Sequence, residues 1–319
     1  MKDLRVSQNN AGPNDLEGYT ALREGAAVVD RSQRILSLTG RDPLGMLNAV
    51  LTNDVPPEED RGAYAMLLNP KGRIQGDLRV IKTDECVLIG TEPEGAQAAK
   101  EILGRYAPFS RVKLEDLSDS YSVLGLYGPH AGELLGNLGL AEHQSKEIAL
   151  EGRALLVVGV EIPVSGYDLI GSTETLAATR RYLIETSATP ADLDAYETAR
   201  IEAGVPRFGA DITPDNFPGE TGVLDRAVSL EKGCYPGQET VARMYYRGHP
   251  NKRLYRLSVE GPSPVPGTGI FQGEKQVGHL TSIAPLPVNG ETLVLGYLSR
   301  NADERGELRA GDATLRSLA

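Results

Sequence analysis

The sequence predicts an α+β protein whose last part is built from strands alone. Strand-like stretches with alternating apolar residues and helix-like stretches with apolar residues at i, i+3 and i+4 follow one another over the first two-thirds of the chain. From about Leu254, short strand-like stretches are separated by Gly, Pro and Asn turns, which predicts a small barrel or sandwich. The 319 residues exceed the usual size of one hydrophobic core, so we expect two or three domains.

The first α+β unit carries clear local signals. Residues 40–54 are expected to contain a helix with Asp42 as its N-cap and proline in the first helical position. Residues 63–91 have the pattern of consecutive antiparallel strands, joined at 69–72 by a type I turn with Asn, Pro and Gly at its first, second and fourth positions. The strand after this turn alternates apolar and polar residues, which places Asp77 on its polar face.

A second α+β unit is expected to begin near Ser120. A strand there precedes a helix that opens at Pro129, and residues 190–194 break the regular structure before a further helix that Gly204 ends. The other expected elements are helices over 94–106 and 173–186, and strands over 122–128, 153–162, 166–172, 254–261, 269–283, 291–300 and 307–318.

Composition limits the function and the compartment. The formal net charge of -11 and the pI of about 5.0 argue against general affinity for nucleic acid or for an anionic membrane. Cys86 and Cys234 are the only cysteines, so there is no disulfide framework and no CxxC pair for zinc or an iron–sulfur cluster, and we expect no bound metal. Residues 1–18 are polar and lack the apolar region of a secretory signal, and the apolar run at 154–160 is too short to span a bilayer. We therefore expect a cytoplasmic protein.

Cys234 lies in the octapeptide KGCYPGQE, residues 232–239. A Pro-Gly turn and then apolar residues at helical spacing follow it, so Cys234 is expected just before a helix N-terminus, where the helix dipole, Lys232 and Arg243 favour a thiolate. Residues 232–256 carry six basic side chains and one acid, a net charge of +5. Two interpretations stay open: a reactive thiol beside an anion-binding surface, or a small packed side chain beside a solvated basic face.

The octapeptide matches all seven specified positions of K-G-C-Y-x-G-Q-E, and the chain therefore resembles the YgfZ family of folate-binding proteins. This family is related to the glycine-cleavage T-protein, an aminomethyltransferase. The resemblance covers almost the whole chain. LLNPKGRIQGDLRV resembles the family's N-x-x-G hairpin, ARIEAGVPRFGADI its R-x-E-x-G helix, and QVGHLTS the G-x-x-T-S turn of its C-terminal barrel.

The resemblance implies an α+β fold of three domains in a ring around a central channel, two with antiparallel sheets and a C-terminal β-barrel. On this basis we expect residues 1–118 to form domain 1, completed by 195–248, residues 119–194 to form domain 2, and 249–319 to form the barrel. It also implies tetrahydrofolate as the ligand, and iron–sulfur client or assembly proteins as partners. Such proteins help to make or maintain the clusters on which tRNA-modifying enzymes depend, and no resident cluster is implied.

The resemblance also implies which residues form the site. Cys234 is expected to be the critical thiol with Lys232 beside it, and Asp77 a carboxylate near the one-carbon centre of folate. Glu202 resembles the pterin-binding position, since a carboxylate accepts two N–H bonds from the pterin edge. The other expected folate contacts are Tyr64 by stacking, Arg247 and Lys252 at the glutamate tail, and Arg200, Tyr235, Gln238, Glu239 and Arg243.

Several of these residues also have an interpretation in which they bind no ligand. Asp77 could be a solvated strand residue, Tyr64 a core aromatic, and Glu202 a polar residue near a helix end. T-proteins carry two aspartates on the second hairpin strand, whereas this chain has Gly76 before Asp77, which counts against ordinary aminomethyl transfer. Three functions follow: a tetrahydrofolate-binding accessory protein of iron–sulfur metabolism, a folate-dependent aminomethyltransferase, and an RNA-binding module that uses the basic residues within 232–256.

Overall fold

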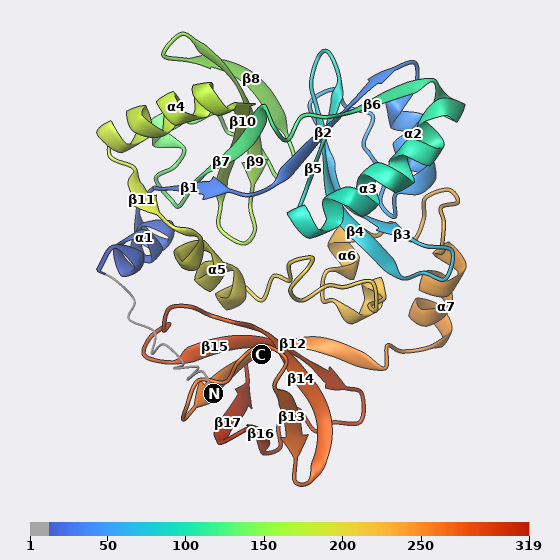
Figure 1. The fold of residues 1–319 in the computed structure, drawn as a ribbon, viewed down its shortest axis with the longest axis vertical. Coiled ribbons are helices and arrows are strands. Elements are labelled where there is room, and N and C mark those ends of the chain that lie inside the picture. Colours follow the sequence, from blue (N-terminus) through green and yellow to red (C-terminus); the bar gives the residue numbers. More distant parts are fainter. Residues whose placement is uncertain (1–12, 319) are drawn as a thin grey trace, which may run out of the picture.

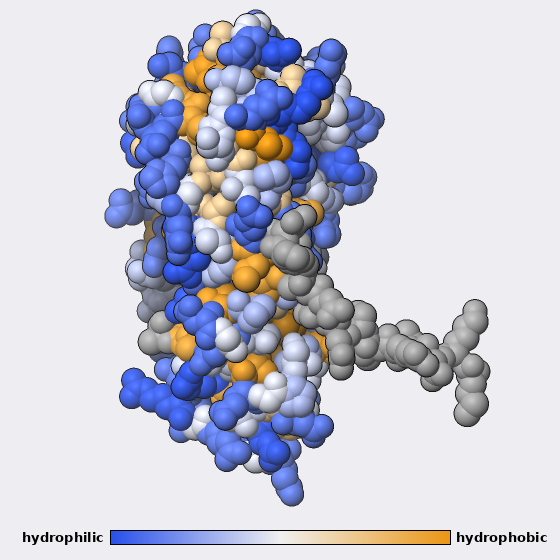
Figure 2. Space-filling view, turned by 90° about the vertical axis from the view of Figure 1, so that its left-hand side faces the viewer, coloured by the Kyte–Doolittle hydropathy of each residue, from blue (hydrophilic) through white to orange (hydrophobic). Residues whose placement is uncertain are grey.

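Three bodies built on separate sheets surround a common centre (Figure 1). The computed structural model describes residues 13–318. In Figure 1 two open sheets lie side by side, and a closed six-stranded barrel lies below them. Seen from its left-hand edge, the molecule is narrow, and hydrophobic side chains gather along the middle of a largely hydrophilic face (Figure 2). Two α+β bodies followed by a C-terminal barrel confirm the predicted fold class.

The five-stranded sheet is antiparallel throughout, in the order β3-β4-β5-β2-β6. Its local signals form as predicted: Asp42 caps α2 by accepting a hydrogen bond from the Gly45 amide at 2.9 Å, and the Gly72 amide closes the turn on Asn69 O at 2.9 Å. The helices pack their apolar side chains on one face of the sheet. The elements are β2 Arg34–Gly40, α2 Pro43–Val50, β3 Ala63–Leu68, β4 Ile74–Lys82, β5 Val87–Thr91, α3 Pro93–Tyr106, η1 Ala107–Ser110 and β6 Val112–Asp116.

The six-stranded sheet has the order β11-β1-β7-β10-β9-β8 and is antiparallel except where β11 pairs with β1. Helix α5 packs on α1 and β1 and also contacts β15 (Thr292–Ser299) of the barrel, so it lies where the bodies meet (Figure 1). The elements are α1 Pro13–Glu24, β1 Ala27–Arg31, β7 Tyr121–Tyr127, η2 Glu133–Leu135, β8 Ser145–Leu150, β9 Arg153–Val160, β10 Gly166–Ser172, α4 Thr173–Glu185, β11 Thr189–Ala191 and α5 Leu193–Glu202.

The barrel closes in the order β12-β15-β14-β13-β16-β17, around a core of its own. A connecting segment, residues 203–251, joins α5 to this barrel, and its helix α6 packs on β3. The elements are η3 Pro218–Glu220, α6 Leu224–Ala227, α7 Gln238–Arg247, β12 Lys252–Glu260, β13 Gly269–Gln272, β14 Lys275–Ile283, β15 Thr292–Ser299, β16 Leu308–Ala310 and β17 Ala313–Ser317.

Two local expectations are wrong, and one strand was not expected. The helix expected from Pro129 is a single 3-10 turn, η2, because Gly136 and Asn137 adopt positive φ angles that end it at once. The break expected at 190–194 contains part of β11, which gains its partner from distant β1. Strand β8 was not expected, because several of its positions are exposed and its sequence shows no clear alternation of apolar and polar residues.

The sheet to which β1 belongs is relevant to the expected domain limits. Strand β1 lies inside the range 1–118, yet it pairs with β7 and β11 of the six-stranded sheet. The limits themselves stay a prediction. Residues 1–12, which form most of the polar N-terminal stretch, lie outside the described residues. Within 13–318, the structure contains no helix with the length and apolar character that a membrane crossing requires.

Candidate functional site

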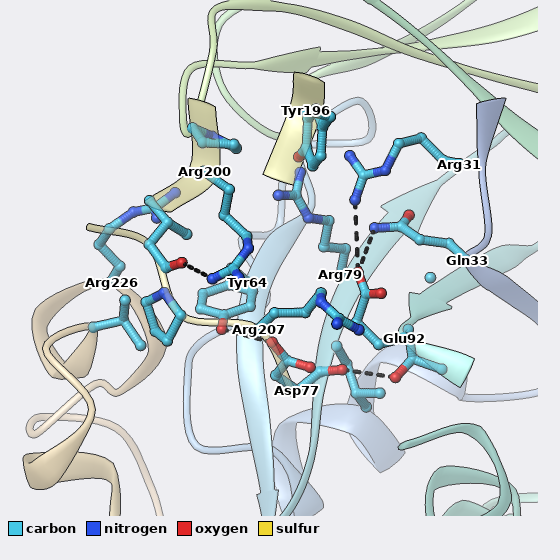
Figure 3. Close-up of a pocket in the computed structure, with 17 residues that line it drawn as sticks. Arg31, Gln33, Tyr64, Asp77, Arg79, Glu92, Tyr196, Arg200, Arg207 and Arg226 are labelled. Carbon is cyan, nitrogen blue, oxygen red and sulfur yellow. Dashed lines mark hydrogen bonds and ion pairs between the residues drawn. The ribbon is translucent and has the colours of Figure 1, made fainter. Parts of the chain in front are cut away.

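A central hollow opens where the two sheets and the connecting segment meet (Figure 3). Its cavity volume is about 60 Å³, and the total space is about 630 Å³ when its open mouth is counted. The side chains that define it are Arg31 of β1, Tyr64 of β3, Asp77 and Arg79 of β4, Glu92, Tyr196 and Arg200 of α5, Arg207, and Arg226 of α6.

Asp77 is the buried carboxylate of this hollow. The Tyr64 hydroxyl donates a hydrogen bond to Asp77 Oδ2 at 2.8 Å, while Asp77 Oδ1 makes no hydrogen bond (Figure 3). Burial, and then the nearby charge of Glu92, raise the pKa of Asp77 to about 6. The interpretation of Asp77 as a solvated strand residue is therefore wrong, because the polar face of β4 is covered by α5 and the connecting segment rather than by water.

Arginines line the wall around Asp77. Arg79 lies two residues further on the same face of β4, and its Nη1 is 3.7 Å from Asp168 Oδ2, too far for a hydrogen bond. Arg31 donates to the Tyr127 hydroxyl at 2.9 Å, and its guanidinium lies 4.0 Å from the ring centre of Tyr196. These contacts hold Arg31 and Tyr196 in fixed orientations at the hollow.

Arg200 lines the hollow, but all its N–H groups are already hydrogen-bonded within the protein. Its five N–H groups bond to both oxygens of Glu197 at 3.0 and 2.9 Å, Asp211 Oδ2 at 2.7 Å, Val205 O at 2.6 Å and Ser282 Oγ at 3.0 Å. Asp211 also accepts hydrogen bonds from the Arg207 amide and from the Ser282 hydroxyl. Arg200 thus ties α5 to the connecting segment and the barrel, which is a structural role.

Two expected folate contacts lie away from the hollow. Glu202 accepts a hydrogen bond from the Tyr19 hydroxyl at 2.7 Å and pairs with Arg23, both on α1. Lys252 lies over the ring of Tyr297, 4.6 Å from its centre, in a wider hollow beside the barrel. Neither side chain lines the central hollow.

The Cys234 loop, residues 228–237, packs against the turn at 69–72 that precedes β4. Cys234 is exposed and is not among the residues that line the hollow. Lys232 Nζ donates to the carbonyls of Leu51 and Asn53, both at 2.8 Å, and burial lowers the pKa of Lys232. Of the two interpretations of Cys234, the small packed side chain is therefore wrong, and Lys232 anchors the loop rather than reaching the hollow.

The other residues expected near the thiol also lie away from the central hollow. Tyr235 is buried in a core beneath the loop, and Gln238 reaches back toward the carbonyl of Lys232 at 3.4 Å. Glu239, Arg243 and Arg247 are exposed on α7, and none of these side chains lines the central hollow. Residues 13–318 hold no group of three His, Cys, Asp or Glu side chains placed to bind a metal ion.

A pair of glycines fixes the Cys234 loop to the hairpin. Gly237 has φ +82° and Gly72 has φ +80°, which favours glycine at both positions. A Cβ on Gly237 would lie 2.6 Å from Asn69 O and 2.8 Å from Gly72 Cα. The octapeptide and the N-x-x-G hairpin thus form one packed unit.

Sequence reasoning missed several side chains of the hollow. They are Arg31, Arg79, Glu92, Tyr196, Arg207 and Arg226. Two of them carried a usable signal. Arg79 shares the strand face of Asp77 at a spacing of two, and Tyr196 shares the helix face of Arg200 at a spacing of four.

Comparison with known proteins agrees with this architecture. Residues 14–232 match the family model described as the GCVT N-terminal domain. A proposed chloroplastic transferase of Arabidopsis thaliana is 27% identical, covering 92% of this chain and 70% of the relative. An aminomethyltransferase of Thermus thermophilus is 28% identical, covering 90% and 84%.

A solved structure shows the same fold. The glycine cleavage system aminomethyltransferase T of Bartonella henselae superposes with a TM-score of 0.82 at 21% identity, covering 95% of this chain and 87% of the other. The family model spans more than half of the 319 residues. This chain belongs to the GCVT N-terminal domain family.

Proposed function

We propose that the protein binds a tetrahydrofolate derivative in the central hollow. The observation that carries this proposal is a set of unsatisfied polar atoms. Among residues 13–318, six buried side-chain nitrogen or oxygen atoms make no hydrogen bond, and three belong to the hollow: Asp77 Oδ1, Arg79 Nη1 and Arg207 Nε. Arg79 Nη1 lies 3.7 Å from an Asp168 oxygen and Arg207 Nε lies 3.5 Å from a Glu197 oxygen, so each is near a carboxylate without a hydrogen bond to it. Because buried polar atoms are normally hydrogen-bonded, these two donors and Asp77 Oδ1 leave room for a ligand or water that offers both an acceptor and a donor.

A pterin fits this donor and acceptor set. Its amino-pyrimidine edge offers N–H groups to the Asp77 carboxylate, and its carbonyl and ring nitrogens accept from the arginines. Tyr64 and Tyr196 supply flat faces for the ring. When bound, a tetrahydrofolate supplies a carrier for one-carbon groups. Relatives named as aminomethyltransferases support this choice of ligand.

We further propose that the protein serves iron–sulfur metabolism in the cytoplasm as a YgfZ-type accessory factor. Cys234 is exposed and lies outside the hollow, so its thiol is open to a partner protein rather than to the bound pterin. The match of the whole octapeptide supports the same role. The clients are then proteins that carry or receive iron–sulfur clusters.

A second candidate function, folate-dependent aminomethyl transfer, gains from one observation. Gly76 faces α3, where an added Cβ would lie 3.7 Å from Gly95 O, while Asp77 faces the hollow. An acid at position 76 would thus point away from the ligand, and its absence does not weaken the site. Formation of methylenetetrahydrofolate from an aminomethyl-carrying lipoyl protein would favour this second function over the accessory role.

Titration calorimetry with tetrahydrofolate tests the binding proposal. We expect saturable binding by the wild type and at least about tenfold weaker binding by Arg79→Met, since one buried donor loses its acceptor on the ligand. The matched control is Glu202→Gln, which should bind as the wild type does, because Glu202 pairs with α1. Absence of saturable binding, or equal loss in both variants, would refute the proposed site.

Replacing Cys234 with alanine should abolish the accessory role without weakening folate binding. The measurement is iron–sulfur enzyme activity in cells that lack their own family member and receive the variant gene. Cys86→Ala is the matched control, because Cys86 is half-buried beside Thr83 and distant in sequence from the octapeptide. If Cys234→Ala restores activity as well as the wild type does, the thiol role is wrong.

A further inference from the structure

An apolar groove lies between α7 and η3, next to the core beneath the Cys234 loop, with which it shares Val241. We call it the α7–η3 groove. Its volume is about 630 Å³ with its mouth included, and its walls are mainly Phe217, Pro218, Leu224, Met244, Tyr245 and Pro250. None of its lining side chains is an aspartate or a glutamate. Apolar concavities of this kind receive an inserted side chain.

Helix α7 buries little of its own surface. Val241 is its one buried residue, whereas Tyr245 is 51% exposed and Tyr246 is 67% exposed. The two tyrosine rings meet edge to face with their centres 5.0 Å apart. Tyrosine is enriched among residues that carry binding energy at protein interfaces, and here Tyr245 lines the groove while Tyr246 contacts Tyr245.

The rim of the groove carries one arginine, and two more lie on α7, the helix that forms one of its walls. Arg243 and Arg247 are exposed on α7, and Arg253 lines the groove from β12. None of the three forms an ion pair with another side chain of residues 13–318. In a chain with a net charge of -11, such a local cationic rim selects partners of negative charge.

We propose that the α7–η3 groove docks an acidic segment of a partner protein that inserts an apolar side chain between Met244 and Pro218. The cationic rim supplies charge complementarity, and the apolar floor supplies the anchor site. The geometry favours protein over single-stranded nucleic acid. Successive bases stack on parallel faces, whereas the rings of Tyr245 and Tyr246 stand at 86° to each other.

Fluorescence anisotropy with the full chain tests the groove. The probe is a labelled glutamate-rich helical peptide with two leucines four residues apart, and its control has serines in place of the leucines. We expect saturable binding of the leucine peptide that weakens with added salt. The double variant Arg243→Glu/Arg247→Glu and the single variant Tyr245→Ala should each weaken it at least tenfold, as loss of an interface anchor does.

Matched controls keep the result specific. Arg105→Glu changes an exposed arginine in the last turn of α3, and Tyr121→Ala removes a tyrosine that is 39% exposed on β7. Both should bind the peptide as the wild type does, and thermal melts should show that every variant folds. Equal binding of the serine peptide, or none by the leucine peptide, would overturn the proposal. The proposal would also be overturned if oligo-uridylate bound more tightly than the leucine peptide and this binding required Arg247. A dimer in sedimentation experiments that Arg247→Glu dissociates would overturn it as well.

Discussion

Replacing Asp77 with asparagine should weaken tetrahydrofolate binding by about 10- to 100-fold and at the same time make the free protein more stable above pH 7. The loss of affinity follows because a carboxylate that accepts N–H bonds from the pterin becomes a neutral amide, and hydrogen bonds to charged groups contribute about 1.5–3 kcal/mol. The gain in stability follows from the raised pKa of Asp77, which burial causes.

The pH dependence separates the two effects. The pKa of Asp77 is about 6 in the folded protein against an ordinary value of 3.8 for an aspartate, so ionising it lowers the free energy of unfolding by up to about 3 kcal/mol as the pH rises from 4 through 6. Asparagine does not ionise. The variant should therefore match the wild type at pH 4 and melt at a higher temperature at pH 8.

Calorimetry and thermal melts at both pH values measure these outcomes. Wild-type affinity should rise with pH through about 6, because the ionised carboxylate is the better acceptor, and the variant should lose this dependence. A variant that binds tetrahydrofolate as tightly as the wild type at pH 8 would remove Asp77 from the site. A variant that melts lower at pH 8 would contradict the raised pKa.

Replacing Asp211 with leucine should destabilise the protein by about 3–5 kcal/mol, because the buried guanidinium of Arg200 keeps only the carboxylate of Glu197 and several buried donors lose their acceptor. Arg200 is 3% exposed and Asp211 is 1% exposed, and their contact at 2.7 Å joins α5 to the connecting segment. Ser282 of the barrel also loses its acceptor. Thermal and urea unfolding report the change.

A double variant isolates the uncompensated charge. Arg200→Met with Asp211→Leu should recover much of the lost stability, since apolar side chains of similar size replace both charges. The control is Glu291→Gln, which breaks the exposed pair with Arg316 at 2.9 Å and should change stability by no more than about 1 kcal/mol. If the double variant is no more stable than Asp211→Leu, the loss arises from packing rather than from the buried charge.

Elements with strong local chemistry were predictable from the sequence. The Asp42 cap and the turn at 69–72 depend on neighbouring residues, and the structure contains both. The barrel strands were predicted in part, because the ranges 269–283 and 307–318 each contain two strands joined by a turn rather than one strand. Strand β11 was not predictable, because its parallel partner β1 lies about 160 residues earlier and gives no local signal. The supposed helix from Pro129 failed because glycine positions there serve left-handed turns.

The site was predicted in part for geometric reasons. Tyr64 and Asp77 lie on strands whose alternation fixes their face, and both reach the hollow. Arg200 and Glu202 were expected together, yet residues two apart on a helix point about 200° from each other. Only Arg200 can therefore face the hollow, whereas Glu202 faces α1. The wall arginines come from separate elements, and only the tertiary fold brings them to Asp77.

The contact between Gly72 and Gly237 also limits how this sequence can vary. Each position has positive φ, and at each an added Cβ would collide with atoms of the other segment. In a library that randomises both codons, clones selected for folded protein should keep glycine at both sites. Gly233, where nothing lies within 4 Å of an added Cβ, should accept many residues in the same selection. A hairpin more than 160 residues earlier in the chain thus restricts which residues can occupy the octapeptide around Cys234.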